Sequence, residues 1–151
     1  DTVSGSVPPT VNLTERTEDG FGQGKVLVSP FGMALAAATV AAGRTPTPHL
    51  IEGRETEITG DREPIPAAVV DNLRPMMQLV VTNGTAKDLQ GAGDVRGKTG
   101  EAEFAGGSHS WFTGYRGDMA FSALIVGGGS SEYAVRMLRG MLDELPPGYL
   151  A

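Results

Sequence analysis

The spacing of apolar residues predicts helices in the first two thirds of the chain and strands in the last third. Residues 31–42 form an uncharged, largely apolar run, and Ser29-Pro30 before it is typical of a helix start, with serine as the N-cap and proline at the first helical position. Gly43 after it fits a left-handed C-terminal residue. Because no face of this segment carries a charge, we expect the helix to be buried on all sides.

A second helix is expected over residues 66–82, between Pro66 and the Asn83-Gly84 turn. Apolar residues recur along it at helical spacings and mark a core-facing stripe, which consists of Val69, Leu73, Met76 and Val80. Pro75 lies inside that stripe and is expected to kink or divide the helix. The methionines of this segment are interpreted as core filler.

The last third of the chain predicts a three-stranded antiparallel meander. Extended runs occupy residues 95–104, 110–115 and 119–126, and glycine-containing turns separate them. A final helix is expected over residues 131–145. Its buried stripe is Val135, Leu138, Leu142 and Leu145.

Two stretches lack a clear periodicity. Residues 1–20 are interpreted as loop, and residues 44–66 as either short strands or an irregular connection. The order of the remaining segments is helix, helix, three strands, helix. This order indicates an α+β fold in which helices pack on an antiparallel sheet.

Composition excludes several classes of function. The chain of 151 residues fits one domain, and its net charge of −6 argues against nucleic-acid partners, which require a basic face. Cysteine is absent, so disulfides and thiolate metal sites are excluded. The only histidines, His49 and His109, have no second ligand at metal spacing, so we expect no metal and no cofactor. Because the chain starts at Asp1 with neither an initiator methionine nor a signal peptide, we expect it to derive from a longer polypeptide.

The candidate chemistry lies in Gly97-Lys98-Thr99-Gly100. A phosphate-binding loop would require a glycine at the position of Ala92 and a helix after the lysine, and the sequence predicts another strand instead. The two glycines leave the strand bare, so that an extended peptide could pair with its edge through main-chain hydrogen bonds. Lysine and threonine would suit a substrate carboxylate, while a solvated strand with a chance sequence is the alternative interpretation.

With its neighbours, this strand resembles the penicillin-recognising serine enzymes. Three segments occur in the order of that family. They are Gly22-Gln23-Gly24 with the helix that follows it, Gly84-Thr85-Ala86, and Lys98-Thr99-Gly100 followed by Trp111-Phe112-Thr113-Gly114-Tyr115. The pattern is similar to the C-terminal part of a penicillin-binding protein transpeptidase domain of class B, as in mycobacterial or actinobacterial penicillin-binding lipoproteins. The fold implied is therefore the C-terminal portion of such a domain, spanning residues 1–151.

The resemblance implies a serine D,D-transpeptidase that cross-links peptidoglycan, with the D-Ala-D-Ala stem peptide and β-lactams as its ligands. Lys98 would shape the electrostatics and the proton network, Thr99 would bind the ligand carboxylate, and Gly100 would leave room for the peptide. The backbone N–H of Glu101 would take the oxyanion-hole position. Many relatives carry threonine where this chain has Glu101, and we expect its carboxylate to repel an anionic substrate terminus.

The sequence departs from the family in two motifs. None of its eight serines is followed by lysine three residues later, and Ser-x-Asn is absent. We therefore expect the nucleophile-bearing half of the domain to be missing, the chain alone to be inactive, and the chain to dimerise or exchange elements. The polypeptide it derives from is expected to be anchored to the cell membrane on its outer side. A β-lactam sensor, a serine β-lactamase and a non-catalytic peptide-binding module are the alternatives.

Overall fold

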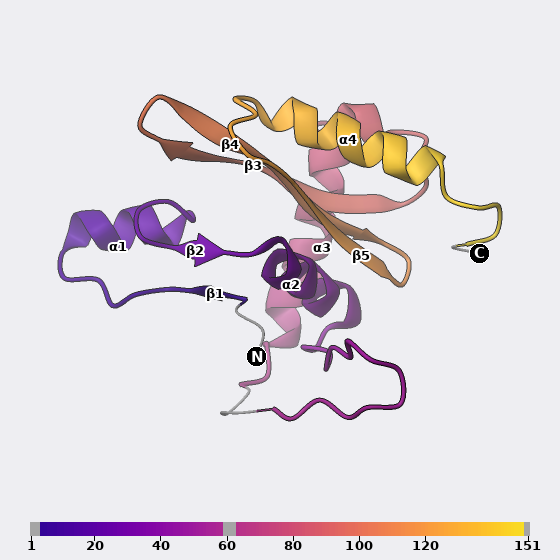
Figure 1. Ribbon diagram of the computed structural model, residues 1–151, viewed down its shortest axis with the longest axis horizontal. Helices are drawn as coiled ribbons and strands as arrows, with labels where there is room; N and C mark the ends of the chain where they lie inside the picture. The colour runs from indigo at the N-terminus through magenta and orange to yellow at the C-terminus, as the bar shows by residue number, and fades with distance from the viewer. Residues whose placement is uncertain (1–3, 59–62, 150–151) are drawn as a thin grey trace.

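A three-stranded antiparallel sheet forms the centre of the molecule. The structure, a computed structural model, describes residues 4–58 and 63–149. The sheet contains β3 (Val95–Phe104), β4 (Gly107–Arg116) and β5 (Met119–Ile125), in that order. The predicted meander is therefore confirmed, and β3 is an outer strand (Figure 1).

Helices pack on both faces of this sheet, as expected for an α+β fold. The helix α4 (Ser131–Asp143) covers one face, and α2 (Pro30–Ala42) lies on the other (Figure 1). The helix α3 (Ala67–Thr82) packs against β3. The Thr113 hydroxyl on β4 donates a hydrogen bond of 2.9 Å to the Met33 carbonyl, which ties the start of α2 to the sheet.

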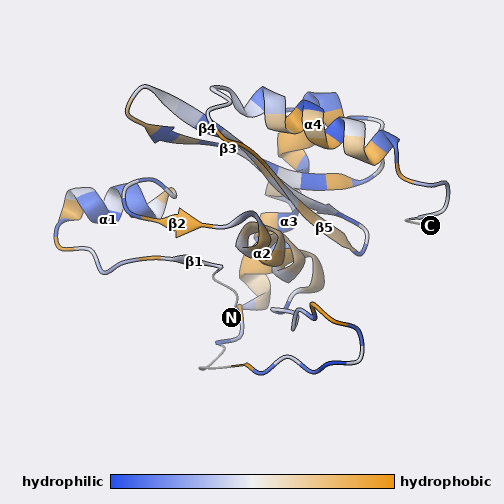
Figure 2. Cartoon of the chain, viewed as in Figure 1, coloured by the Kyte–Doolittle hydropathy of each residue, from blue (hydrophilic) through white to orange (hydrophobic). Residues whose placement is uncertain are grey.

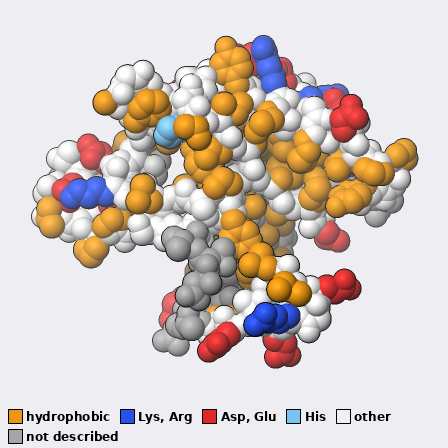
Figure 3. Space-filling model, viewed as in Figure 1, with side chains coloured by type: hydrophobic (Ala, Val, Ile, Leu, Met, Phe, Trp, Pro, Cys, Tyr) orange, Lys and Arg blue, Asp and Glu red, His pale blue; other side chains and the backbone are white. Residues whose placement is uncertain are grey.

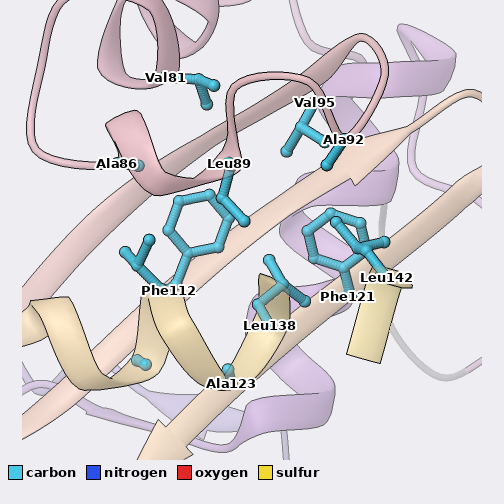
Figure 4. Close-up of a cluster of buried hydrophobic side chains, with 12 residues drawn as sticks. Val81, Ala86, Leu89, Ala92, Val95, Phe112, Phe121, Ala123, Leu138 and Leu142 are labelled. Carbon is cyan, nitrogen blue, oxygen red and sulfur yellow. The ribbon is translucent and has the colours of Figure 1, made fainter. Parts of the chain in front are cut away.

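The hydrophobic core lies between α4 and the sheet. Phe112 and Phe121 on neighbouring strands stack with ring centroids 6.3 Å apart, and Leu89 of the short 3-10 helix η1 (Lys87–Leu89) joins them (Figure 4). Three members of the predicted α4 stripe are buried in this core: Val135, Leu138 and Leu142. Leu145 lies beyond the end of the helix but packs against the same cluster.

The prediction that the apolar helix is buried on all sides is wrong. The helix α2 has its expected ends, with Ser29 as N-cap and Gly43 left-handed at φ 70°. Figure 2 shows no hydrophilic face along it. Within it, however, only Ala37 and Thr39 are buried. The sheet and α3 cover one side of the helix, and the β1–β2 region lies near its start but leaves an open cavity along it.

The stripe predicted on α3 also differs from the structure. Val70 and Val81 are buried, whereas Val69 and Met76 are 45% and 61% exposed. Three residues of the predicted stripe, Leu73, Met76 and Val80, line an open apolar cavity next to α2. Only Val80 of these three also packs against the core cluster. Pro75 does not divide the helix, which continues through it.

The N-terminal region contains a helix that the sequence did not predict. α1 (Leu13–Gly20) lies where residues 1–20 were interpreted as loop, and the strands β1 (Gly5–Ser6) and β2 (Leu27–Val28) pair beside it. The Asn12 side chain accepts a hydrogen bond of 2.9 Å from the Glu15 N–H and begins the helix.

Glu15 in turn fixes the approach to this helix. Its carboxylate accepts hydrogen bonds of 3.0 Å from the Val11 N–H and 2.9 Å from the Lys25 ammonium. The Val11 N–H and then Lys25 lower the pKa of Glu15 from its ordinary value, and Glu15 raises the pKa of Lys25. Polar contacts, and not an apolar stripe, therefore hold α1.

The connection between α2 and α3 is irregular. Residues 44–58 and 63–66 form neither helix nor strand, so of the two interpretations the irregular connection is confirmed there, while residues 59–62 lie outside the described part. No helix in the described part of the chain is both long and apolar enough to cross a membrane.

Candidate active site

The centre of the candidate site is the open edge of β3. In an antiparallel pair, the main-chain groups of every second residue point to the partner strand and those of the others point away. The Glu101 carbonyl accepts a hydrogen bond of 2.9 Å from the Gln23 side-chain amide, and the Thr99 carbonyl accepts one of 2.6 Å from the Lys98 ammonium. The carbonyl groups of Thr99 and Glu101 therefore point outward, and their N–H groups share that direction.

The register with β4 decides which side chains share a face of the sheet. Lys98 lies opposite Thr113, and Gly100 lies opposite Trp111. Directly opposed residues project to the same side, so this set shares the face that carries α2. Thr99 lies opposite Phe112 and projects to the other face, with α4.

A cavity of about 500 Å³ opens on the α2 side of this edge. Residues 98–102 border it, together with Trp111 and Thr113 from β4 and Met33 from α2. The segment after α1 forms the opposite wall: Phe21, Gly22, Gln23, Val26 and Val28. Figure 3 shows the molecule hollowed between the α1 region and the sheet. An extended ligand could lie along β3 in this cavity.

Lys98 also borders a second cavity, of about 420 Å³, between α2 and α3. Its lining is apolar except for Lys98 and Thr113, and it includes Ala37 of α2 and Met76 of α3. Lys98 thus lies where the two cavities meet, and its ammonium is the charged group that borders both of them.

The Thr99 hydroxyl has a partner that the sequence did not indicate. The residue Thr99 is 6% exposed, and its hydroxyl lies 2.6 Å from the hydroxyl of Thr85, in the turn after α3. Either hydroxyl can donate in this pair. Because Thr85 can accept or donate, it can set the direction in which the Thr99 hydrogen points.

The Glu101 carboxylate does not point into the cavity, so the expected repulsion of an anionic ligand loses its basis. Its side chain projects from the face opposite Lys98, and it accepts a hydrogen bond of 2.9 Å from the Ser131 N–H at the start of α4. The positive end of the helix macrodipole favours a carboxylate in that position. The side chain therefore joins β3 to α4, while the main chain of the same residue faces the open edge.

The structure thus brings the four predicted residues together on one strand edge, Lys98, Thr99, Gly100 and Glu101. Sequence reasoning assigned no role to Gln23 or Thr85, although both lie in the segments on which the resemblance rests. Their only signal in the sequence is the glycine beside each of them. His109 accepts a hydrogen bond of 3.0 Å from the Gly127 N–H. In the described residues, no cluster of three or more histidine, aspartate or glutamate side chains could hold a metal ion.

Comparisons with known proteins give one family match and a structural match to a known fold. The profile of the family described as penicillin binding protein transpeptidase domain matches residues 2–138. Among solved structures, the chain resembles PBP2 of Pseudomonas aeruginosa, determined in complex with WCK 5153, with a TM-score of 0.62 and 22% sequence identity. The similarity covers 91% of this chain and 35% of the other, so the chain spans about a third of that protein's length. No curated protein sequence matches the chain significantly.

Proposed function

Because the chain belongs to the penicillin-binding protein transpeptidase-domain family, we propose that it forms part of a serine D,D-transpeptidase of the cell envelope that cross-links peptidoglycan and binds β-lactams. The observation that carries this proposal is the open edge of β3, where the outward main chain of Thr99 and Glu101 borders a cavity of about 500 Å³. A stem peptide that ends in D-Ala-D-Ala would lie along this edge as an added strand.

Three residues of the edge, Lys98, Gly100 and Glu101, have distinct parts in the proposed reaction. The positive charge of the Lys98 ammonium attracts the ligand carboxylate. The same group takes part in proton transfer at the nucleophile. Gly100 leaves the strand free of a side chain beside the ligand. The Glu101 N–H, which faces the open edge, donates to the oxygen that becomes negative in the tetrahedral intermediate.

We also propose that the nucleophile belongs to a segment outside residues 1–151. Each of the eight serines lacks a lysine three residues later, so no serine has the adjacent base of the family. The apolar cavity between α2 and α3 borders Lys98 and has room for a packed segment. A serine carried there would lie beside the Lys98 ammonium, either from the same polypeptide or from a partner copy that exchanges elements.

The experiment compares Lys98 with a matched lysine. In the polypeptide that contains both this chain and its nucleophile, Lys98→Ala should lower the rate of labelling by a fluorescent penicillin about 100-fold or more, the scale on which loss of one electrostatic group acts. Lys87→Ala is the control, since Lys87 is exposed on η1 and borders neither cavity at the site.

Residues 1–151 alone should remain unlabelled by the same reagent. Covalent labelling of this shorter chain would show that it has its own nucleophile. Equal rates for Lys98→Ala and the unmodified polypeptide would exclude the proposed site.

A further inference from the structure

Gln23 reaches the candidate site from a distant part of the sequence. It lies in the turn after α1, between Gly22 at φ 82° and Gly24 at φ 68°, and its own N–H donates 3.0 Å to the Glu18 carbonyl. From this fixed turn its side chain spans the cavity, and its amide nitrogen lies 2.9 Å from the Glu101 carbonyl oxygen.

The atom that Gln23 contacts is one that an added strand would need. A peptide that pairs with an outer strand donates its N–H groups to the outward carbonyls and accepts from the outward N–H groups. Glu101 presents one of each at the centre of the edge. The Gln23 amide supplies an N–H of the same kind as a peptide bond, so it occupies the hydrogen-bonding position of the ligand.

We propose that Gln23 is a displaceable substitute for the ligand amide, and that it selects for ligands that donate a main-chain N–H strongly enough to replace it at the Glu101 carbonyl. This inference rests on the proposed function, because it takes the D,D-peptide as the added strand. Ligands that bind without this hydrogen bond would leave Gln23 in place.

Two properties of the hydrogen bond between Gln23 and Glu101 indicate that a ligand can displace Gln23 and that the contact is not a permanent structural one. The side chain is only half-buried and its hydrogen bond is exposed to solvent, so water can satisfy the amide when it moves away. A neutral hydrogen bond of this kind also contributes little net free energy, which corresponds to about a fivefold change in an equilibrium constant. When the outward carbonyls of an outer strand already accept hydrogen bonds from side chains of the same protein, the strand is protected against pairing with other chains while no ligand is bound.

The test measures reversible binding of Nα,Nε-diacetyl-L-Lys-D-Ala-D-Ala to residues 1–151 by nuclear magnetic resonance titration. Gln23→Met keeps the length of the side chain and removes its donor, and we expect it to tighten binding about fivefold. Gln90→Met is the matched control: the Gln90 amide also donates to a main-chain carbonyl, that of Thr82 at 2.8 Å, but it borders neither cavity at the site. The affinity of the Gln90→Met variant for the peptide should equal that of the unmodified chain.

A second measurement needs no variant. In the unmodified chain labelled with ¹⁵N-glutamine, the side-chain resonances of Gln23 should move to solvent-like positions as the peptide is added. Analogues of the peptide that are N-methylated at one amide at a time should include one that leaves these resonances unchanged, and for that analogue Gln23→Met should bring no gain in affinity.

The outcomes separate this inference from the proposed function. Peptide binding with no movement of the Gln23 resonances, or with unchanged or weaker binding to Gln23→Met, would overturn the displacement and leave the proposed function intact. If the peptide binds to neither the unmodified chain nor the variant, the proposed ligand is wrong, and the proposed role of Gln23 is then rejected as well.

Discussion

Gly97 and Gly100 lie three residues apart on β3, but a side chain would meet different surroundings at the two positions. A Cβ atom at Gly97 would overlap the Phe112 ring and lie 2.5 Å from the Thr113 carbonyl oxygen. A Cβ atom at Gly100 would have one near neighbour, the Trp111 Cβ at 3.4 Å. The first glycine is therefore required by the packing of the sheet, and the second leaves space on the side of the cavity.

This contrast predicts that two matched substitutions differ in their effect on stability. Gly97→Ala should lower the free energy of unfolding by about 3 kcal/mol, because neither the backbone oxygen nor the buried ring can move freely. Gly100→Ala should stay within about 1 kcal/mol of the unmodified chain, since alanine loses less conformational entropy than glycine in a strand. Urea denaturation of both variants measures the difference. Similar unfolding midpoints would contradict this account of the two glycines.

At the scale of elements, the sequence predicts those parts whose signals are local. The Ser29 hydroxyl accepts a hydrogen bond of 3.0 Å from the Gly32 N–H, so the start of α2 depends only on neighbours in sequence. The bounds of β3 agree with the predicted range, because glycine-containing turns lie on both sides of it.

The parts that sequence reasoning missed depend on distant contacts. The burial of α3 is decided by what packs against it, and its hydrophobic pattern contains no information on whether a neighbour is present. At the site, the residues of one strand were found because they are consecutive, whereas Gln23 contacts a residue 78 positions away. The helix α1 is an intermediate case: Asn12 and Glu15 have the spacing of a capping box, but few apolar residues accompany them.

The helix α1 should depend on pH through Glu15. The lowered pKa means that the folded helix favours the carboxylate, so the stabilisation is complete at pH 7 and is lost in acid, as the pH falls through the folded-state pKa of Glu15. Cα chemical shifts of α1 followed from pH 7 to pH 2 measure this, with α2 as an internal control because it carries no titratable side chain. Glu15→Gln should remove the transition. A transition that persists in this variant would assign it to another group.

At the scale of the molecule, the two faces of the sheet differ in how completely they are covered. The face under α4 holds the closed core, and the face under α2 borders two cavities. Apolar side chains gather across the middle of the view in Figure 3, and Met76 is among the exposed hydrophobic residues. An apolar surface of this kind marks a place where further protein is expected to pack.

We therefore expect residues 1–151 to bind a hydrophobic fluorescent dye and to self-associate through the cavity between α2 and α3. Met76→Glu should reduce both effects and change the stability by only about 0.5 kcal/mol, because the side chain is 61% exposed. Leu138→Glu is the contrasting variant: at 2% exposure, an unpaired carboxylate in the core should unfold the chain. Dye fluorescence and sedimentation velocity measure the outcome. Undiminished dye binding by folded Met76→Glu would place the exposed apolar surface elsewhere.

The pairing of β3 with β4 has a consequence for how the length of this region can vary in evolution. The two strands pair without a bulge from Val95 opposite Arg116 to Phe104 opposite Gly107. A single residue inserted after Val95 would rotate the following side chains to the other face, so that the lysine would enter the core and the threonine would enter the cavity. Insertions and deletions compatible with the site are therefore confined to segments outside the paired residues, such as the turn at Gly106. Within β3, a change in the number of residues would move Lys98 and Thr99 to the wrong faces of the sheet.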